Sequence, residues 1–149
     1  MAYQSINPYS AEVLQSFKEV SAAELEEKLA VASRCFSDVW AKKTYADRAK
    51  VLVRAAAIMR ERPEEFAKLI TLEMGKLLAQ SMGEVALSAA ILDYYAQNAE
   101  AFLAPEKLTT AKGEASVESS PVGVLFGVEP WNYPYYQIAR FAEIGRAHV

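Results

Sequence analysis

The sequence predicts a fold in which helices come first and strands follow, which is either α/β or α+β. Apolar residues recur at helical spacing in separate segments between residues 21 and 103. From residue 108 the spacing falls to about two, the period of a β-strand. A helical bundle alone would leave these later runs unexplained. The chain of 149 residues is long enough for one domain with a core of its own.

The first elements can be placed from local signals. Residues 3–6 and 13–20 are β-prone runs around the turn signal Asn7-Pro8-Tyr9-Ser10, and we expect a hairpin or an extended arm. Ser21 and Glu24 then have the spacing of a capping box. The helix they open carries apolar residues on one face, namely Leu25, Leu29, Ala32, Phe36 and Val39.

Three more helices are predicted before residue 105. Thr44 is the expected N-cap of the first, and Pro63 suits the first position of the second. Gly75 is expected to end that second helix. The third and longest spans residues 77–103, although Gly83 inside it argues against an uninterrupted helix.

The C-terminal third combines strands with a stiff turn. Residues 115–118 and 122–128 are strand-like, and the second run leads into Gly127-Val128-Glu129-Pro130-Trp131-Asn132-Tyr133-Pro134. The two prolines restrict the backbone around Trp131 and Asn132. Ligands of α/β proteins bind beyond the carboxyl ends of strands, so the Asn132 amide is a candidate hydrogen-bond donor to a ligand.

Composition limits the possible partners. A hydrophobic share of 52%, a charged share of 23% and a net charge of −3 suit a soluble globular protein without a nucleic-acid surface. No apolar run approaches the roughly 18 residues of a membrane helix, and residues 1–10 are too polar for a signal peptide. The single cysteine suits a reducing cytoplasm, and no residues have metal-ligand spacing. We therefore expect a cytoplasmic protein without a membrane partner.

The last seven residues, 143–149, are predicted not to be native. Back-translated as GAG ATC GGA AGA GCA CAC GTC, they match a common sequencing-library adapter after the first G. Residues of this origin have to be excluded from fold reasoning. His148, the only histidine, would then carry no functional information, and the chain would be the front part of a longer protein. The alternative is a natural helix end.

Five short motifs occur in order along residues 1–142: Asn7-Pro8, Ala46-Asp47-Arg48, Leu72-Glu73-Met74-Gly75-Lys76, Pro121-Val122-Gly123-Val124 and Pro130-Trp131-Asn132-Tyr133-Pro134. Each is weak alone, but together they resemble the N-terminal part of the aldehyde dehydrogenase superfamily. Residues 130–140 look most like the bacterial NAD(P)-dependent succinate-semialdehyde dehydrogenases.

This resemblance implies a truncated α/β fold. Residues 1–104 would be the N-terminal helical part of a Rossmann-like cofactor-binding domain, and residues 105–121 strands of an oligomerisation hairpin. Residues 122–142 would supply the first strand and the start of a helix of the cofactor-binding core. The parent enzyme is implied to be a homo-oligomer that oxidises an aldehyde, such as succinate semialdehyde, to the acid with NAD or NADP. Its catalytic cysteine and glutamate lie downstream in the family, so we expect the fragment to be inactive and poorly stable.

The resemblance also implies roles for individual residues. Asn132 matches the oxyanion donor, and the expected cofactor-side residues are Val128, Pro130, Trp131 and Asn132. The expected substrate-binding residues are Tyr133, Gln137 and Arg140. On a helix that starts near Pro134, positions 133, 137 and 140 fall on one face, and a guanidinium there suits a substrate carboxylate. In succinate-semialdehyde dehydrogenases the matching arginine holds that carboxylate.

Each candidate has a simpler interpretation. Asn132 could cap the following helix, Trp131 could be a core aromatic, and Arg140 could be a solvated helix residue. Cys35 lies in an amphipathic helix without a neighbouring histidine and is expected to be a plain helix residue. Glu73 and Glu84 are expected to be surface or structural residues on solvated helices. For the whole chain, the alternatives are a small non-catalytic helical interaction module and a regulatory fragment that joins the oligomer of an intact enzyme.

Overall fold

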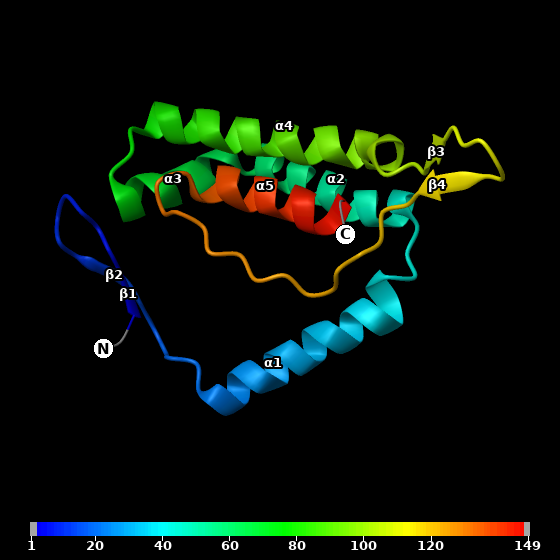
Figure 1. Cartoon of the computed structure of the whole chain (residues 1–149). Coiled ribbons are helices and arrows are strands. Elements are labelled where there is room, and N and C mark those ends of the chain that lie inside the picture. The colour runs from blue at the N-terminus through cyan, green and yellow to red at the C-terminus, as the bar shows by residue number, and fades with distance from the viewer. Residues whose placement is uncertain (1–2, 148–149) are drawn as a thin grey trace.

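A computed structural model describes the backbone of residues 3–147 and the side chains of residues 3–142. Four helices form a helical layer: α2 (Tyr45–Glu61), α3 (Pro63–Met74), α4 (Leu78–Phe102) and α5 (Pro134–Ala147) (Figure 1). Helix α1 (Ala22–Cys35) and two small hairpins lie at the edges of this layer. Residues 148 and 149, the end of the predicted adapter segment, lie outside the described residues, and so does the side chain of every residue after 142.

The N-terminal hairpin is confirmed. Strands β1 (Tyr3–Ile6) and β2 (Val13–Phe17) pair antiparallel. The backbone N–H of Tyr9 donates to Asn7 Oδ1 at 2.9 Å and closes the turn, as the Asn-Pro signal indicates. The second strand ends at Phe17, three residues earlier than the sequence predicts.

Helix α1 begins with the predicted capping box. The N–H of Ser21 donates to Glu24 Oε2 at 2.8 Å, and the N–H of Glu24 donates to Ser21 Oγ at 3.2 Å. The helix ends at Cys35 and continues as a π-helical turn, η1 (Phe36–Trp40). No side chain of α1 is buried, and Figure 1 shows the helix apart from the helical layer. Its apolar face is therefore largely exposed in this structure, although Ala32 at its C-terminal end is half-buried.

The ends of the middle helices follow the sequence signals. The N–H of Asp47 donates to Thr44 Oγ1 at 3.1 Å, and Pro63 occupies the first turn of α3. Gly75 ends α3 in the left-handed region at φ 75°. Helix α4 runs without a break through Gly83, so the interruption suggested by that glycine does not occur.

The core lies where α2, α3, α4 and α5 meet. Small residues on α4 let its neighbours approach closely, and Ser81, Ser88 and Ala89 are fully buried there. The other buried members of the core are Leu52, Ala56, Met59, Ala67, Ile70, Val85, Leu92 and Ala139. Within residues 3–147, no helix is long and apolar enough to span a bilayer.

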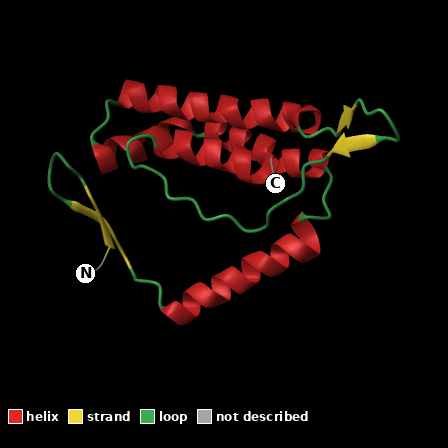
Figure 2. Cartoon of the chain, viewed as in Figure 1, coloured by secondary structure: helices red, strands yellow, loops and turns green. Residues whose placement is uncertain are grey.

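The C-terminal strands are only partly as predicted. Strands β3 (Glu106–Leu108) and β4 (Ala115–Val117) form a two-stranded antiparallel hairpin. The predicted strand over residues 122–128 does not form, and Figure 2 shows that segment as a loop between β4 and α5. A strand needs a partner for its ladder of hydrogen bonds, and no described segment lies beside this one to supply it. Gly123, at φ 108°, also bends the backbone away from an extended conformation.

Two glycine substitutions, one at the end of α3 and one inside α4, should change stability in opposite directions. At Gly75 an added Cβ would face a positive φ and lie 3.3 Å from Pro8 Cγ, so Gly75→Ala should cost about 1–2 kcal/mol. At Gly83 an added Cβ meets nothing within 4 Å, so Gly83→Ala should stabilise α4 by about 0.5–1 kcal/mol. The urea midpoint for loss of the circular dichroism at 222 nm should fall for the first variant and rise for the second. Equal shifts of one sign would contradict these helix boundaries.

Candidate functional site

The candidate site is the turn that precedes α5. Residues 131–133 form the turn, and the side chains of Pro130, Trp131 and Asn132 are exposed. Trp131 keeps 76% of its surface accessible and Val128 keeps 81%, so Trp131 is not a core aromatic in this structure. The predicted cofactor-side residues therefore form an exposed, largely apolar strip beside the Asn132 amide.

A buried lysine holds this turn from beneath. Lys76 follows the glycine that ends α3, and only 9% of its surface is accessible. Its ammonium donates to the backbone carbonyl oxygen of Asn132 at 2.9 Å and lies 3.5 Å from the centre of the Tyr133 ring. The same ammonium forms an ion pair with Glu84 of α4. One side chain thus joins the start of α4 to the turn 56 residues later.

Glu84 caps the helix that follows the turn. Its side chain is fully buried, and its Oε1 accepts the backbone N–H groups of Tyr135 at 3.0 Å and Tyr136 at 3.4 Å. A carboxylate is favourable at this end of a helix because it satisfies free N–H groups and complements the helix dipole. Of the two expected roles, surface or structural, Glu84 has the structural one, although its surroundings are buried and not solvated. Glu73 is exposed, as expected of a surface residue.

This cap changes the interpretation of Asn132. Glu84 satisfies the first N–H groups of α5, and the helix opens with the N–H of Gln137 donating to the carbonyl of Tyr133 at 2.9 Å. Within the described residues, no hydrogen bond joins the Asn132 side chain to the backbone of α5. Asn132 is thus not the cap, and its amide is available to a ligand.

Arg140 lies on an aromatic row along α5. Its Nη1 donates to the Tyr136 hydroxyl oxygen at 3.4 Å, and the Tyr136 ring meets the Tyr133 ring edge-on at a centroid distance of 6.1 Å. The row connects Tyr133 to Arg140 through Tyr136, which the sequence did not single out. Gln137 is half-buried beside it. No carboxylate among residues 3–142 pairs with the Arg140 guanidinium, which is exposed.

A hollow of about 470 Å³ lies beside Trp131, between the turn and helix α3. Leu69 and Glu73 line it from α3, and Trp131 and Tyr135 line it from the turn and α5. The Tyr135 ring also packs edge-on against Phe66 at 5.4 Å. Burial raises the pKa of the Tyr135 hydroxyl above its ordinary value, and the carboxylates of Glu73 and Glu84 raise it further. Tyr135 therefore stays neutral at physiological pH.

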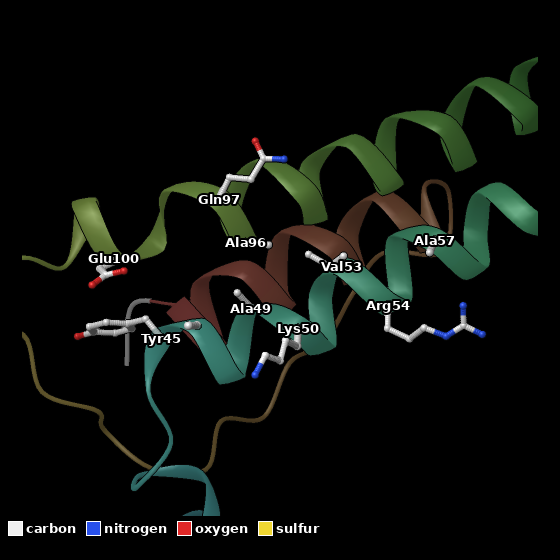
Figure 3. Close-up of a pocket in the computed structure, with 10 residues that line it drawn as sticks. Tyr45, Ala49, Lys50, Val53, Arg54, Ala57, Ala96, Gln97 and Glu100 are labelled. Carbon is white, nitrogen blue, oxygen red and sulfur yellow. The ribbon is translucent and has the colours of Figure 1, made fainter.

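A second hollow, of about 530 Å³, lies along α2 and α4 (Figure 3). Ala49, Val53 and Ala96 give it an apolar floor, while Arg54 extends away from it. None of the predicted site residues lines it. It is an apolar groove between helices without an evident nucleophile.

Cys35 has the surroundings of a plain helix residue. It is exposed, and the hollow beside it is otherwise lined by apolar residues and Gly123. No acid or base lines that hollow to activate a thiol. Among the residues that the structure describes, no group of three or more His, Cys, Asp or Glu side chains could hold a metal ion.

Comparisons with known proteins match the chain to one family. The sequence model of the aldehyde dehydrogenase family matches residues 1–144. A succinate-semialdehyde dehydrogenase [NADP(+)] of Deinococcus radiodurans is 44% identical over 140 residues, which are 94% of this chain and 29% of that protein. A probable succinate-semialdehyde dehydrogenase [NADP(+)] of a Synechocystis strain is 38% identical over 142 residues, covering 95% of this chain and 31% of that protein.

Solved structures agree as well. The succinic semialdehyde dehydrogenase of Streptococcus pyogenes, in complex with NADP+, superposes with a TM-score of 0.91 at 39% identity, over 98% of this chain and 32% of that one. A second structure, described in terms of cofactor and substrate selection by Gox0499, gives a TM-score of 0.96 at 35% identity, over 99% of this chain and 32% of that one. The predicted resemblance is confirmed, and the chain spans about 30% of the length of these relatives.

The Lys76–Glu84 pair predicts a compensated double variant. Lys76→Met leaves a buried carboxylate without its cation and should cost about 3–5 kcal/mol. Adding Glu84→Gln removes that charge while an amide oxygen still accepts the N–H of Tyr135, so much of the loss should be recovered. Urea unfolding followed at 222 nm measures both variants. A double variant no more stable than Lys76→Met would contradict the pairing.

Proposed function

The chain belongs to the aldehyde dehydrogenase family, and we propose that it is the N-terminal part of a longer enzyme that oxidises an aldehyde to a carboxylic acid with NADP+. The relatives at 44% and 38% identity bear names that specify NADP(+) and succinate semialdehyde. The observation that carries the proposal is the Asn132 amide. It is exposed on a fixed turn, beside an apolar strip, and at a position that matches the oxyanion donor of the family.

The role of Asn132 follows from the chemistry of the reaction. A cysteine thiolate, supplied by the part of the enzyme beyond this chain, attacks the carbonyl carbon, and an electron pair of the C=O bond moves onto oxygen. The Asn132 amide donates a hydrogen bond to that oxygen as its charge develops. This oxyanion becomes a cysteine thioester only if the carbon loses a hydride, for which NADP+ would be the acceptor. A water that a glutamate activates would then hydrolyse the thioester, which releases the acid and returns the thiolate. Neither that cysteine nor that glutamate is in this chain, so the 149-residue chain alone is inactive.

The exposed strip fits a nicotinamide cofactor. Val128, Pro130 and Trp131 present apolar surface next to Asn132, and the flat face of a pyridinium ring can lie against such a surface, most favourably against an indole. These residues would hold the nicotinamide end of NADP+, which supplies the acceptor for the hydride.

Arg140 supports a substrate with a second charged end. Its guanidinium is exposed, it leans on the Tyr136 ring at 5.6 Å, and no described carboxylate neutralises it. We assign it, with Tyr133 and Gln137, to the carboxylate end of succinate semialdehyde, because a guanidinium binds a carboxylate through two parallel hydrogen bonds.

The complete enzyme is proposed to be a cytoplasmic homo-oligomer. The β3–β4 hairpin projects beyond the helical layer (Figure 2), and all six of its strand residues are exposed. Its outer edges keep unpaired backbone groups, which can extend a sheet of another subunit.

The complete gene and one substitution test the reaction. The gene should continue in frame past codon 142 to a glycine-containing cofactor loop and a later cysteine. In the full-length enzyme it encodes, Asn132→Ala should lower kcat by about 10²–10³, measured as NADPH formation at 340 nm. Asn98→Ala removes an amide that only bonds to the Tyr94 carbonyl within α4, and it should leave kcat unchanged. A native gene that ends after residue 149, or an Asn132→Ala enzyme with full activity, would refute the proposal.

The substrate assignment has its own test. Loss of a charge-assisted pair worth about 1.5–3 kcal/mol should make Arg140→Ala raise KM for succinate semialdehyde about 10-fold to 100-fold. KM for butyraldehyde, an uncharged aldehyde of the same length, should stay as it is. Arg34→Ala, a change in the last turn of α1, serves as the control for a lost positive charge. Equal rises for both aldehydes would exclude the assignment.

A further inference from the structure

We propose that Lys76 and Glu84 are positioning residues that fix the direction of the Asn132 amide during the reaction. This inference rests on the proposed role of Asn132 as the oxyanion donor. It concerns two buried side chains, one of which reaches the main chain of Asn132 and not its side-chain amide.

Pro130 and Pro134 restrict the backbone of the turn, but little else within the turn holds Asn132. The residues before it form no strand, and the side chains of Trp131 and Asn132 are exposed. Within the described residues, the hydrogen bond that reaches the backbone of Asn132 from another part of the chain comes from Lys76, at 2.9 Å. Because the acceptor is the carbonyl oxygen of Asn132 itself, this bond fixes the peptide plane next to its Cα atom.

Glu84 holds the other side of the same turn. It binds the N–H groups of Tyr135 and Tyr136, which come directly after Pro134. The pair therefore forms hydrogen bonds to the main chain on both sides of Tyr133. Lys76 binds the carbonyl of Asn132 before the helix, and Glu84 binds two N–H groups in the first turn of α5. The ammonium also lies 3.5 Å from the Tyr133 ring centre, which limits rotation of the segment between these hydrogen bonds.

The pair stands on a rigid base. Lys76 is placed by the left-handed Gly75 at the end of α3, and Glu84 lies on α4 between the fully buried Ser81, Val85 and Ser88. Their side chains are 7% and 0% exposed, so solvent does not compete for their hydrogen bonds. Well-packed apolar residues often replace a buried ion pair without loss of stability. The presence of Lys76 and Glu84 at this place is therefore better explained by the orientation of Asn132 than by a gain in stability.

The position matters because an oxyanion donor works only when it is held at the right distance. A misplacement of about 1 Å can cost about 100-fold in rate. Removing the pair should therefore lower kcat without changing how the aldehyde binds. The effect should be the same for charged and uncharged aldehydes, unlike the effect of Arg140→Ala.

The test uses Lys76→Met together with Glu84→Gln in the full-length enzyme. This variant removes both charges, so neither is left unpaired in the interior, and the amide oxygen introduced by Glu84→Gln can still cap α5. We expect kcat to fall about 10-fold to 100-fold for succinate semialdehyde and butyraldehyde alike, with both KM values unchanged. The matched control is Arg60→Met with Asp93→Asn, which removes the ion pair between α2 and α4, and it should leave kcat unchanged.

A double-mutant cycle separates positioning from a general loss of structure. If the pair acts through Asn132, adding its two substitutions to Asn132→Ala should lower kcat no further, because the group they position is already absent. Two results would overturn the inference. One is a further 10-fold to 100-fold loss of kcat when the two substitutions are added to Asn132→Ala. The other is full activity of a folded Lys76→Met/Glu84→Gln enzyme. If Asn132→Ala alone has no effect, the proposed function fails instead.

Should the two-site variant not fold, Lys76→Gln with Glu84→Gln provides the second measurement. It replaces the ion pair by an amide pair, which keeps a donor in reach of the Asn132 carbonyl. This variant should still lose part of kcat, equally for both aldehydes, because a neutral amide is a weaker donor than an ammonium and leaves the Tyr133 ring without its cation. If Lys76→Gln/Glu84→Gln matches the wild type while Asn132→Ala is inactive, the inference is overturned.

Discussion

The contact between the Lys76 ammonium, the Glu84 carboxylate and the turn at Asn132 organises this chain. The helical layer could pack its apolar core without it, since the core residues come from the helix interiors. The turn, however, has few other ties to the layer. Two buried charges thus fix the end of a long loop where it joins α5. The Asn132 side chain on that loop therefore has less conformational freedom than it would have on a loop without these contacts.

The same contact explains why the exposed strip and the buried base lie on opposite sides of one short segment. The carbonyl of Asn132 and the N–H groups of Tyr135 and Tyr136 bond inward to Lys76 and Glu84. The side chains of Trp131 and Asn132 are exposed, whereas the Tyr133 ring lies against the Lys76 ammonium. Main-chain groups thus attach this segment to the helical layer, and exposed side chains remain free to bind a ligand. A ligand can therefore bind without breaking the hydrogen bonds that hold the segment.

Local signals in the sequence predicted local structure well. The capping box at Ser21 and Glu24, the Thr44 cap, Pro63 and Gly75 each act within a few residues, and each marks a helix end in the structure. Long-range facts were harder to predict. A strand over residues 122–128 requires a partner, and Glu84 is buried by groups 51 and 52 residues away. The one available sign was Lys76, a charged residue directly after a helix-ending glycine within a family motif, and its partner could not be read from spacing alone.

The unpaired segment over residues 122–128 has a consequence for biosynthesis. When a ribosome makes a longer protein from its N-terminus, at roughly 5–20 residues per second, this segment emerges before any strand that follows it. In this structure Phe126 is 90% exposed and Val122 75% exposed, so the segment offers apolar surface to other chains until a partner strand covers it. Pro121 and Pro130 border it, and the left-handed Gly123 interrupts it, so it is poorly shaped to pair with a neighbouring nascent chain on the same messenger. The two prolines and Gly123 therefore reduce the tendency of residues 122–128 to pair with a strand of another chain before a strand of the same protein is available.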